Sequence, residues 1–163
     1  CTAYGRMYKW ATVVGKTEAE CGYGNSCDLP STGHVQGICP EGWHVPRRAE
    51  VETLVEAAGG DDFAGKALKA TSTWSDYENN GKVYGNGTDA TGFTGYSTGT
   101  CSGSSSEPYC NYDGMYTHMW TITENYSGEQ AYYFGLLWMG NGVTLLNGDK
   151  RDYKNLRCVQ DED

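Results

Sequence analysis

Seven cysteines have the widest choice of chemistry in this chain, because a thiol can bind a metal, attack a substrate or form a disulfide. They lie at positions 1, 21, 27, 39, 101, 110 and 158. No two have the Cys-x-x-Cys spacing of a zinc ribbon, so disulfides formed in an oxidising compartment are the better interpretation. Seven thiols can form three bonds in many combinations, and their spacing alone does not choose among them.

The three histidines predict neither a catalytic site nor a metal site. His44 lies in a Trp-His-Val-Pro turn, where we expect a packed structural residue. His34 and His118 fall in loops, without a neighbouring Cys or acid at the spacing of a triad or a metal site. We therefore expect no catalytic residues and no enzyme.

Acidic residues in loops and at strand ends leave the metal content unknown and a structural Ca²⁺ open, because Ca²⁺ takes oxygen ligands of this kind. None forms an EF-hand loop, and the EPN and QPD triplets of calcium-type lectins are missing. No other cofactor is expected. These acids are Asp76, Glu78, Asp89, Asp113, Glu124 and Asp149.

Aromatic side chains give the stronger binding signal. Residues 71–118 are mostly Gly, Ser, Thr, Asn and Tyr, and a loop region of this length tends to be functional. Flat rings beside amides and carboxylates suit sugar or peptide surfaces, although the same rings also pack beneath Gly-rich loops. The candidate ligand-binding residues are Trp74, Tyr77, Tyr84, Tyr96, Tyr109, Tyr112 and Tyr116.

Three other tryptophans are assigned to the core because their neighbours are apolar. These are Trp10, Trp43 and Trp120. Around them, the periodicity predicts a helix over 47–58, which begins after Pro46 and ends at two glycines, and a short helix over 62–70, capped by Asp61 or Asp62. Strands are expected at 4–11, 119–123, 131–139, 142–146 and 156–160, with a hairpin turn at 140–142.

The composition excludes several classes of partner. A net charge of -9 argues against nucleic acid and anionic membranes, because phosphates bind basic patches. The apolar runs are too short for a membrane span. A length of 163 residues suits one domain, and 23 Gly with 13 Tyr suit a loop-rich extracellular one. Because no signal peptide precedes Cys1, we expect a leader that was cleaved, trimmed or not included.

Several segments together carry a family resemblance. Residues 37–60 (GICPEGWHVPRRAEVETLVEAAGG), 4–10 (YGRMYKW), 87–93 (GTDATGF), 119–124 (MWTITE) and 155–161 (NLRCVQD) resemble the Fibrobacter succinogenes major paralogous domain, a module of bacterial secreted and surface proteins. HVPRRAEVE, AAGG and LRCV are more distantly similar to the formylglycine-generating-enzyme type of C-type-lectin fold. The first resemblance covers nearly the whole chain.

The resemblance implies one extracellular domain over 1–163 with an α+β, C-type-lectin-like fold. Two helices would pack on a twisted antiparallel sheet, with long ordered loops above it. Together with locality, the resemblance favours three disulfides: Cys21–Cys27, Cys101–Cys110 and Cys39–Cys158. Cys1 would then have lost an upstream partner, carry an acyl group, or join another chain.

The expected function is a secreted or cell-surface adhesion module that binds a polysaccharide or a surface protein through the aromatic loops. The main alternative is a globular subunit or tip domain of an extracellular filament or pilus, with self-assembly or a covalent partner at Cys1. An oxidase related to the formylglycine enzymes is remote, because residues 139–156 hold no cysteine for the reactive pair.

Overall fold

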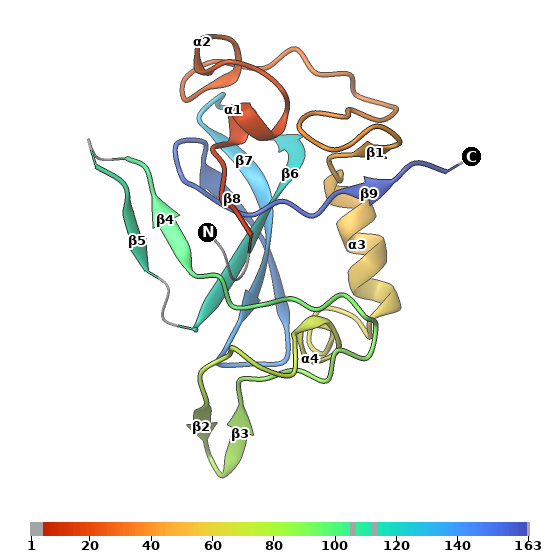
Figure 1. Ribbon diagram of the computed structural model, residues 1–163, viewed down its shortest axis with the longest axis vertical. Coiled ribbons are helices and arrows are strands. Elements are labelled where there is room, and N and C mark those ends of the chain that lie inside the picture. Colours follow the sequence, from red (N-terminus) through yellow and green to blue (C-terminus); the bar gives the residue numbers. More distant parts are fainter. Residues whose placement is uncertain (1–4, 105–106, 112–113, 163) are drawn as a thin grey trace.

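A three-stranded antiparallel sheet forms the centre of the domain (Figure 1). The computed structural model describes residues 5–104, 107–111 and 114–162. The sheet consists of β6 (Tyr116–Glu124), β7 (Gln130–Leu137) and β8 (Val143–Asp149), in that order. The expected strands 119–123, 131–139 and 142–146 are thus confirmed within a few residues. The turn between β7 and β8 contains Gly140 and Gly142, as the hairpin signal predicted.

Two helices lie beside this sheet, as the periodicity predicted. The longer, α3 (Arg48–Ala57), buries Val51 and Val55, and the Glu50 carboxylate caps its start by accepting a hydrogen bond from the Arg47 N–H at 2.8 Å. The shorter is α4 (Ala64–Leu68). Its N-cap is Phe63 rather than either expected aspartate, and no side chain caps it. The α+β class is confirmed, whereas the narrower C-type-lectin-like architecture stays an expectation.

The strand expected at 4–11 is wrong. The segment makes one antiparallel bridge, between Tyr8 and Lys154, and then turns into α1 (Trp10–Val13), followed by α2 (Glu18–Cys21). The edge of β6 is already taken, because Met119 forms a parallel bridge with Asn155. Trp10 is fully buried instead, and its indole N–H donates to the Thr121 carbonyl at 2.9 Å. Competition for the sheet edge therefore decides the conformation of this segment.

Three two-stranded ladders complete the domain. The region 71–118 contains two of them, β2 (Tyr77–Asn79) with β3 (Lys82–Tyr84) and β4 (Thr100–Ser102) with β5 (Tyr109–Asn111). Asn80 and Gly81 both have positive φ in the turn between β2 and β3, the conformation that an Asn-Gly hairpin turn requires. The third ladder joins β1 (Trp43–His44) to β9 (Val159–Gln160) and so brings distant parts of the chain together.

The three expected disulfides are present. Cys21–Cys27 and Cys101–Cys110 close short segments, and Cys101 and Cys110 also face each other across the β4–β5 ladder. Cys39–Cys158 joins residues 119 positions apart, just outside the β1–β9 ladder. Cys1 lies outside the described residues.

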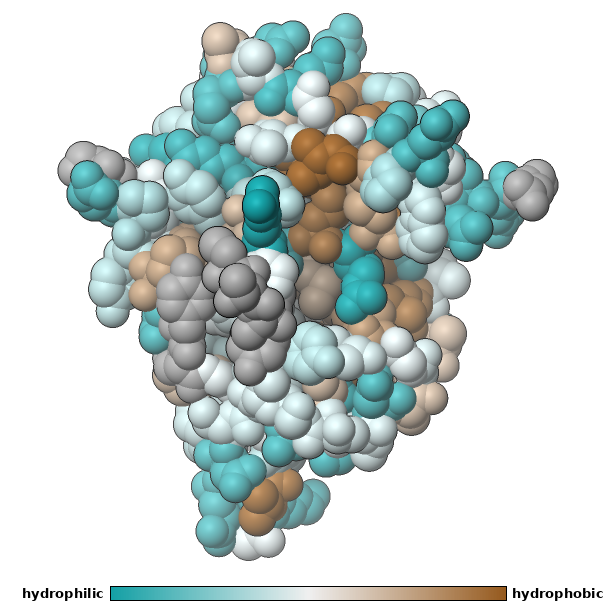
Figure 2. All heavy atoms as spheres, in the orientation of Figure 1, coloured by the Kyte–Doolittle hydropathy of each residue, from teal (hydrophilic) through white to brown (hydrophobic). Residues whose placement is uncertain are grey.

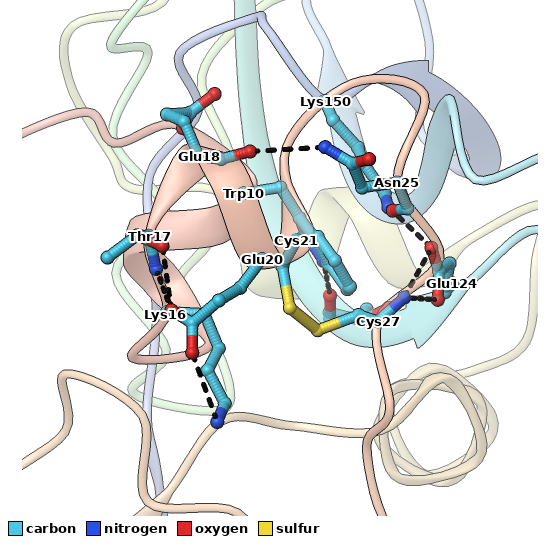
Figure 3. Close-up of a disulfide and its surroundings, with 11 residues drawn as sticks. Trp10, Lys16, Thr17, Glu18, Glu20, Cys21, Asn25, Cys27, Glu124 and Lys150 are labelled. Carbon is cyan, nitrogen blue, oxygen red and sulfur yellow. Dashed lines mark hydrogen bonds and ion pairs between the residues drawn. A yellow bond between two sulfur atoms is a disulfide. The ribbon is translucent and has the colours of Figure 1, made fainter.

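A buried ion pair lies next to the Cys21–Cys27 disulfide (Figure 3). The Lys150 ammonium is completely buried, contacts the Glu124 carboxylate, and donates to the Asn25 carbonyl at 2.8 Å. It also lies 4.5 Å from the centre of the Trp10 ring. The same carboxylate accepts the Cys27 N–H at 2.9 Å. Glu124 therefore fastens the disulfide loop and neutralises Lys150, which explains one of the acids that the sequence left open for calcium.

We expect the long disulfide to stabilise the fold more than the short ones. In the chain-entropy model, a cross-link across 119 residues contributes about 5 kcal/mol, whereas one across 9 residues contributes about 2.5 kcal/mol. Urea unfolding of C39A/C158A and of C101A/C110A measures both losses. Equal losses, or a larger loss in C101A/C110A, would contradict this order.

Substitution of Glu124 should be costly because it leaves the Lys150 charge buried and unneutralised. We expect Glu124→Gln to lower the free energy of unfolding by about 3 kcal/mol, the usual cost of breaking a buried pair. Glu52→Gln is the matched control, because Glu52 pairs with Arg48 at 2.7 Å on the exposed face of α3. That variant should change stability by less than about 0.5 kcal/mol. Similar effects of the two substitutions in denaturant titrations would show that the buried pair is not stabilising.

Candidate ligand-binding cleft

A cleft of about 560 Å³ opens between α3, the central sheet and the segments 91–93 and 157–159. One wall is formed by Val51, Leu54 and Ala57 of α3, and the floor by Met119 and Phe134 of the sheet. Figure 2 shows apolar residues gathered beside α3 on this face, where the surface is hollowed. A concave, largely apolar lining of this size is typical of a ligand site.

Aromatic rings and charged groups form the rim of the cleft. Trp43 lies there with 38% of its surface exposed, so its expected place in the core is wrong. Successive residues of a strand point to opposite sides, and in β1 it is His44 that is buried. On the other side, the Arg157 guanidinium lies 4.7 Å from the centre of the Phe93 ring and donates to the Phe93 carbonyl at 2.7 Å. Glu50 contributes the opposite charge.

A smaller groove, of about 230 Å³, continues the cleft towards residues 5–8, since both are lined by Met119 and Arg157. Tyr96, one of the candidate aromatics, lies on this groove and is 38% exposed. The structure thus brings one described candidate next to the cleft. The periodicity of residues 47–58 predicted this helix, but no local signal showed that its apolar side would line a cleft.

The remaining candidate aromatics that the structure describes do not share one surface. Trp74 is buried, with its indole N–H donating to the Gly95 carbonyl at 2.9 Å, because residues 73–75 fold beneath the loop at 95–97. Tyr77 and Tyr84 face each other across the β2–β3 ladder, and Tyr77 packs 4.7 Å from Trp138.

The last three candidates lie near β4–β6 or outside the description. Tyr109 lies on β5 and is 73% exposed, whereas Tyr116 is half-buried on β6, 6.0 Å from His118. Tyr112 lies outside the described residues. The six described candidates are therefore spread over several elements, and the cleft is lined mainly by other parts of the chain.

A histidine cluster adjoins the cleft through Glu50, and it gathers acids beside two histidines that have no acid at the spacing of a metal site in the sequence. His44 is buried, and its two ring nitrogens lie 2.6 Å from Asp161 and 2.8 Å from Glu50. The ring of His34 stacks on it at 3.8 Å, and the His34 Nδ1 lies 3.1 Å from the same Asp161 oxygen. No local signal could have shown this cluster, because 117 residues separate His44 from Asp161.

The electrostatics of the cluster favour positive charge at His44. Burial alone would lower the pKa of the His44 imidazole, but its hydrogen bonds to Glu50 and Asp161 outweigh burial and raise it. Burial likewise would raise the pKa of Glu50, but hydrogen bonds from the Arg47 N–H and His44 hold it below its usual value. Within the described residues, His34, His44 and Asp161 are the one group of three or more His, Cys, Asp or Glu residues whose ligand atoms lie within 4.8 Å of one another.

The acids considered for calcium have other partners or stand apart. Asp89 accepts hydrogen bonds from the Thr94 N–H at 2.6 Å and hydroxyl at 2.8 Å, and Asp149 pairs with Arg151 at 2.6 Å. Asp76 and Glu78 are exposed on the 71–79 segment, and Asp113 lies outside the described residues.

His118 is not a loop residue as expected, since it lies on β6 opposite Gly135. Its ring packs 4.5 Å from that of Tyr133. Burial and the nearby Lys154 ammonium lower the pKa of His118 to about 4. The pocket that His118 and Tyr133 line is also lined by Asp149 and Asp152. His118 is thus a neutral packing residue.

The family model of the Fibrobacter succinogenes major domain matches residues 1–160 of the 163. No curated protein and no solved structure matches the chain. Among the described residues, no helix has both the length and the apolar character needed to cross a bilayer. The family and the three disulfides fit an extracellular or surface domain.

His118 should make the protein less stable in mild acid. In the unfolded chain it takes up a proton as the pH falls through about 6.5, but in the folded protein only near pH 4. The unfolded state therefore binds more protons between these values, and stability falls as the pH is lowered, by about 3 kcal/mol at pH 4. Unfolding of the wild type and of His118→Gln between pH 7 and pH 4 tests this. If the free energy of unfolding falls equally in both proteins between pH 7 and pH 4, the assignment is wrong. This holds even if the variant is less stable than the wild type at every pH.

Proposed function

The chain belongs to the Fibrobacter succinogenes major domain family, and we propose that it is an extracellular, non-catalytic module that binds an apolar segment of another surface protein. The observation that carries this proposal is the cleft beside α3, with its apolar walls and aromatic rim. The three disulfides that cross-link the fold support an extracellular location.

The lining favours a protein ligand over a polysaccharide. Sugar hydroxyls need several hydrogen-bonding groups, whereas the walls and floor of this cleft are formed largely by aliphatic and aromatic side chains. Glu50 and Arg157 border it and suit the backbone or termini of a peptide. With a net charge of -9, the chain favours neutral or basic partners over acidic ones.

One anchoring side chain in the cleft would give measurable affinity. Burial of a Leu or Phe side chain contributes about 1.5–3 kcal/mol, which corresponds to at least about tenfold in the dissociation constant. Trp43 and Phe93 would flank the anchor, as aromatic residues do at many protein interfaces.

Filling the cleft should abolish this binding. Ala57 lines the cleft from an exposed position on α3, so Ala57→Phe closes it without burying a new group in the core. Ala49 is exposed on the same helix away from the cleft, so Ala49→Phe is the matched control. A displayed random-peptide library is selected on the wild type, and affinities of the enriched peptides are measured by fluorescence anisotropy. We expect aliphatic and aromatic peptides that bind A57F at least about tenfold more weakly, and A49F unchanged.

Three results would overturn the proposal. Equal peptide binding by the wild type and A57F would place the ligand elsewhere on the protein. Binding on a glycan array that A57F does not weaken, with no enriched peptide, would favour a polysaccharide and the 71–118 loops. Assembly of the wild type into filaments at micromolar concentration, without any added ligand, would favour the structural alternative.

A further inference from the structure

His34, His44 and Asp161 come from three segments that other contacts already hold in place. His44 and Asp161 are fixed by the β1–β9 ladder, in which His44 faces Val159, and by a hydrogen bond from the Asp161 N–H to the Gly42 carbonyl at 2.9 Å. The Cys39–Cys158 disulfide lies directly beside this ladder.

The His34 loop is fixed from the start of α3. The Arg47 guanidinium donates to the Pro30 carbonyl at 2.9 Å and to the Gly33 carbonyl at 3.0 Å. The Val45 N–H also donates to the Val35 carbonyl at 2.9 Å. These bonds position the imidazole of His34 against His44. The two rings are therefore held together without any movement of the loop that carries His34.

We propose that His34, His44 and the Asp161 carboxylate bind one divalent transition-metal ion of the Zn²⁺ class. Their ligand atoms lie within 4.8 Å of one another, and both Nδ1 atoms already converge on a single Asp161 oxygen. Two imidazole nitrogens with one carboxylate oxygen suit zinc, copper or nickel and do not suit Ca²⁺ or Mg²⁺, which prefer all-oxygen sites.

Glu50 completes the site from the far side of the His44 ring. Its carboxylate lies 2.8 Å from Nε2, and the Nδ1 of His44 is directed at Asp161, so a metal bound at Nδ1 would replace the proton that this nitrogen shares with Asp161. A carboxylate on the second nitrogen is the usual partner of a metal-bound histidine, because it fixes the tautomer and makes the ligand more basic. Together with Asp161, it supplies negative charge around a buried ring in a position suited to a cation.

The difference in burial lets the ligands adjust to a metal. The current spacings are hydrogen-bond distances, and bonds of about 2.0–2.2 Å from metal to each ligand require the groups to separate slightly around the ion. His44 is fixed in the interior, whereas the side chains of His34 and Asp161 are 47% and 38% exposed and can rotate. Because two of the three ligands lie at the surface, a fourth coordination position would face solvent.

Zinc titration of the untagged chain tests the site. After treatment with EDTA, we expect one Zn²⁺ per chain by isothermal titration calorimetry, and Co²⁺ to give the visible absorption of a nitrogen- and oxygen-bound ion. His34→Asn and Asp161→Asn should each weaken Zn²⁺ binding at least about tenfold, and Glu50→Gln by about 10- to 100-fold. Glu162→Gln is the matched control, an exposed acid next to Asp161, and should bind as the wild type does.

The exposed ligands make the test independent of folding. His34→Asn and Asp161→Asn remove surface side chains, and unchanged circular dichroism would verify that both variants fold. No saturable Zn²⁺ binding by the wild type, or equal binding by all of these variants, would overturn the proposal and leave a structural cluster that Asp161 and Glu50 hold by hydrogen bonds. Because Ala57 is not part of the cluster, failure of this test leaves the A57F result unaffected.

Discussion

The C-terminal segment 153–161 is the part on which the rest of the structure depends, because it pairs with four regions that are distant in sequence. The first is β4, where the Tyr153 N–H donates to the Cys101 carbonyl at 2.9 Å. Lys154 exchanges two backbone hydrogen bonds with Tyr8, and Asn155 bridges β6 through Trp120 and His118. Further on, the segment forms the β1–β9 ladder and carries the Cys39–Cys158 bond. Its side chains then supply one wall of the cleft and the Asp161 carboxylate. This one segment therefore completes the fold and contributes to both candidate sites. It crosses the front of the domain in Figure 1.

Buried lysines are a second feature on which the structure depends. The composition does not indicate them, because the chain has few cations and a large negative charge. Lys69, Lys150 and Lys154 are each buried against a tryptophan ring, at 4.4–5.2 Å from its centre. Lys69 donates to the Leu137 and Gly140 carbonyls at 3.0 and 2.8 Å, and burial lowers its pKa to about 8. Loop carbonyls that cannot reach water need such donors. Lys69 and Lys150, which donates to the Asn25 carbonyl, thus satisfy backbone carbonyls, whereas Lys154 pairs with the Asp152 carboxylate at 3.0 Å.

Local signals in the sequence predicted local structure well. The apolar stripe of α3, the turn between β7 and β8, and the short disulfides all depend on residues close together in the chain. The errors lie where distant segments compete. Trp43 was assigned to the core and is exposed, because the β1–β9 ladder turns His44 inward. Trp74 was assigned to a binding loop and is buried beneath residues 95–97. The family resemblance supplied the Cys39–Cys158 pairing that no local pattern contains.

Glu50 connects the two candidate sites. Its carboxylate caps α3 through the Arg47 N–H, bonds the Nε2 of His44, and lies at the rim of the cleft. A ligand that contacted Glu50 would therefore compete with His44 for the carboxylate, and a cation bound at the Nδ1 of His44 would make the Nε2–H a stronger donor and hold the carboxylate more firmly at the ring. Since the capping bond also fixes the first turn of α3, either event would act on the wall that carries Val51 and Leu54. Occupancy of the histidine cluster and of the cleft should accordingly be coupled through this one side chain, with each ligand changing the affinity of the other by the same factor.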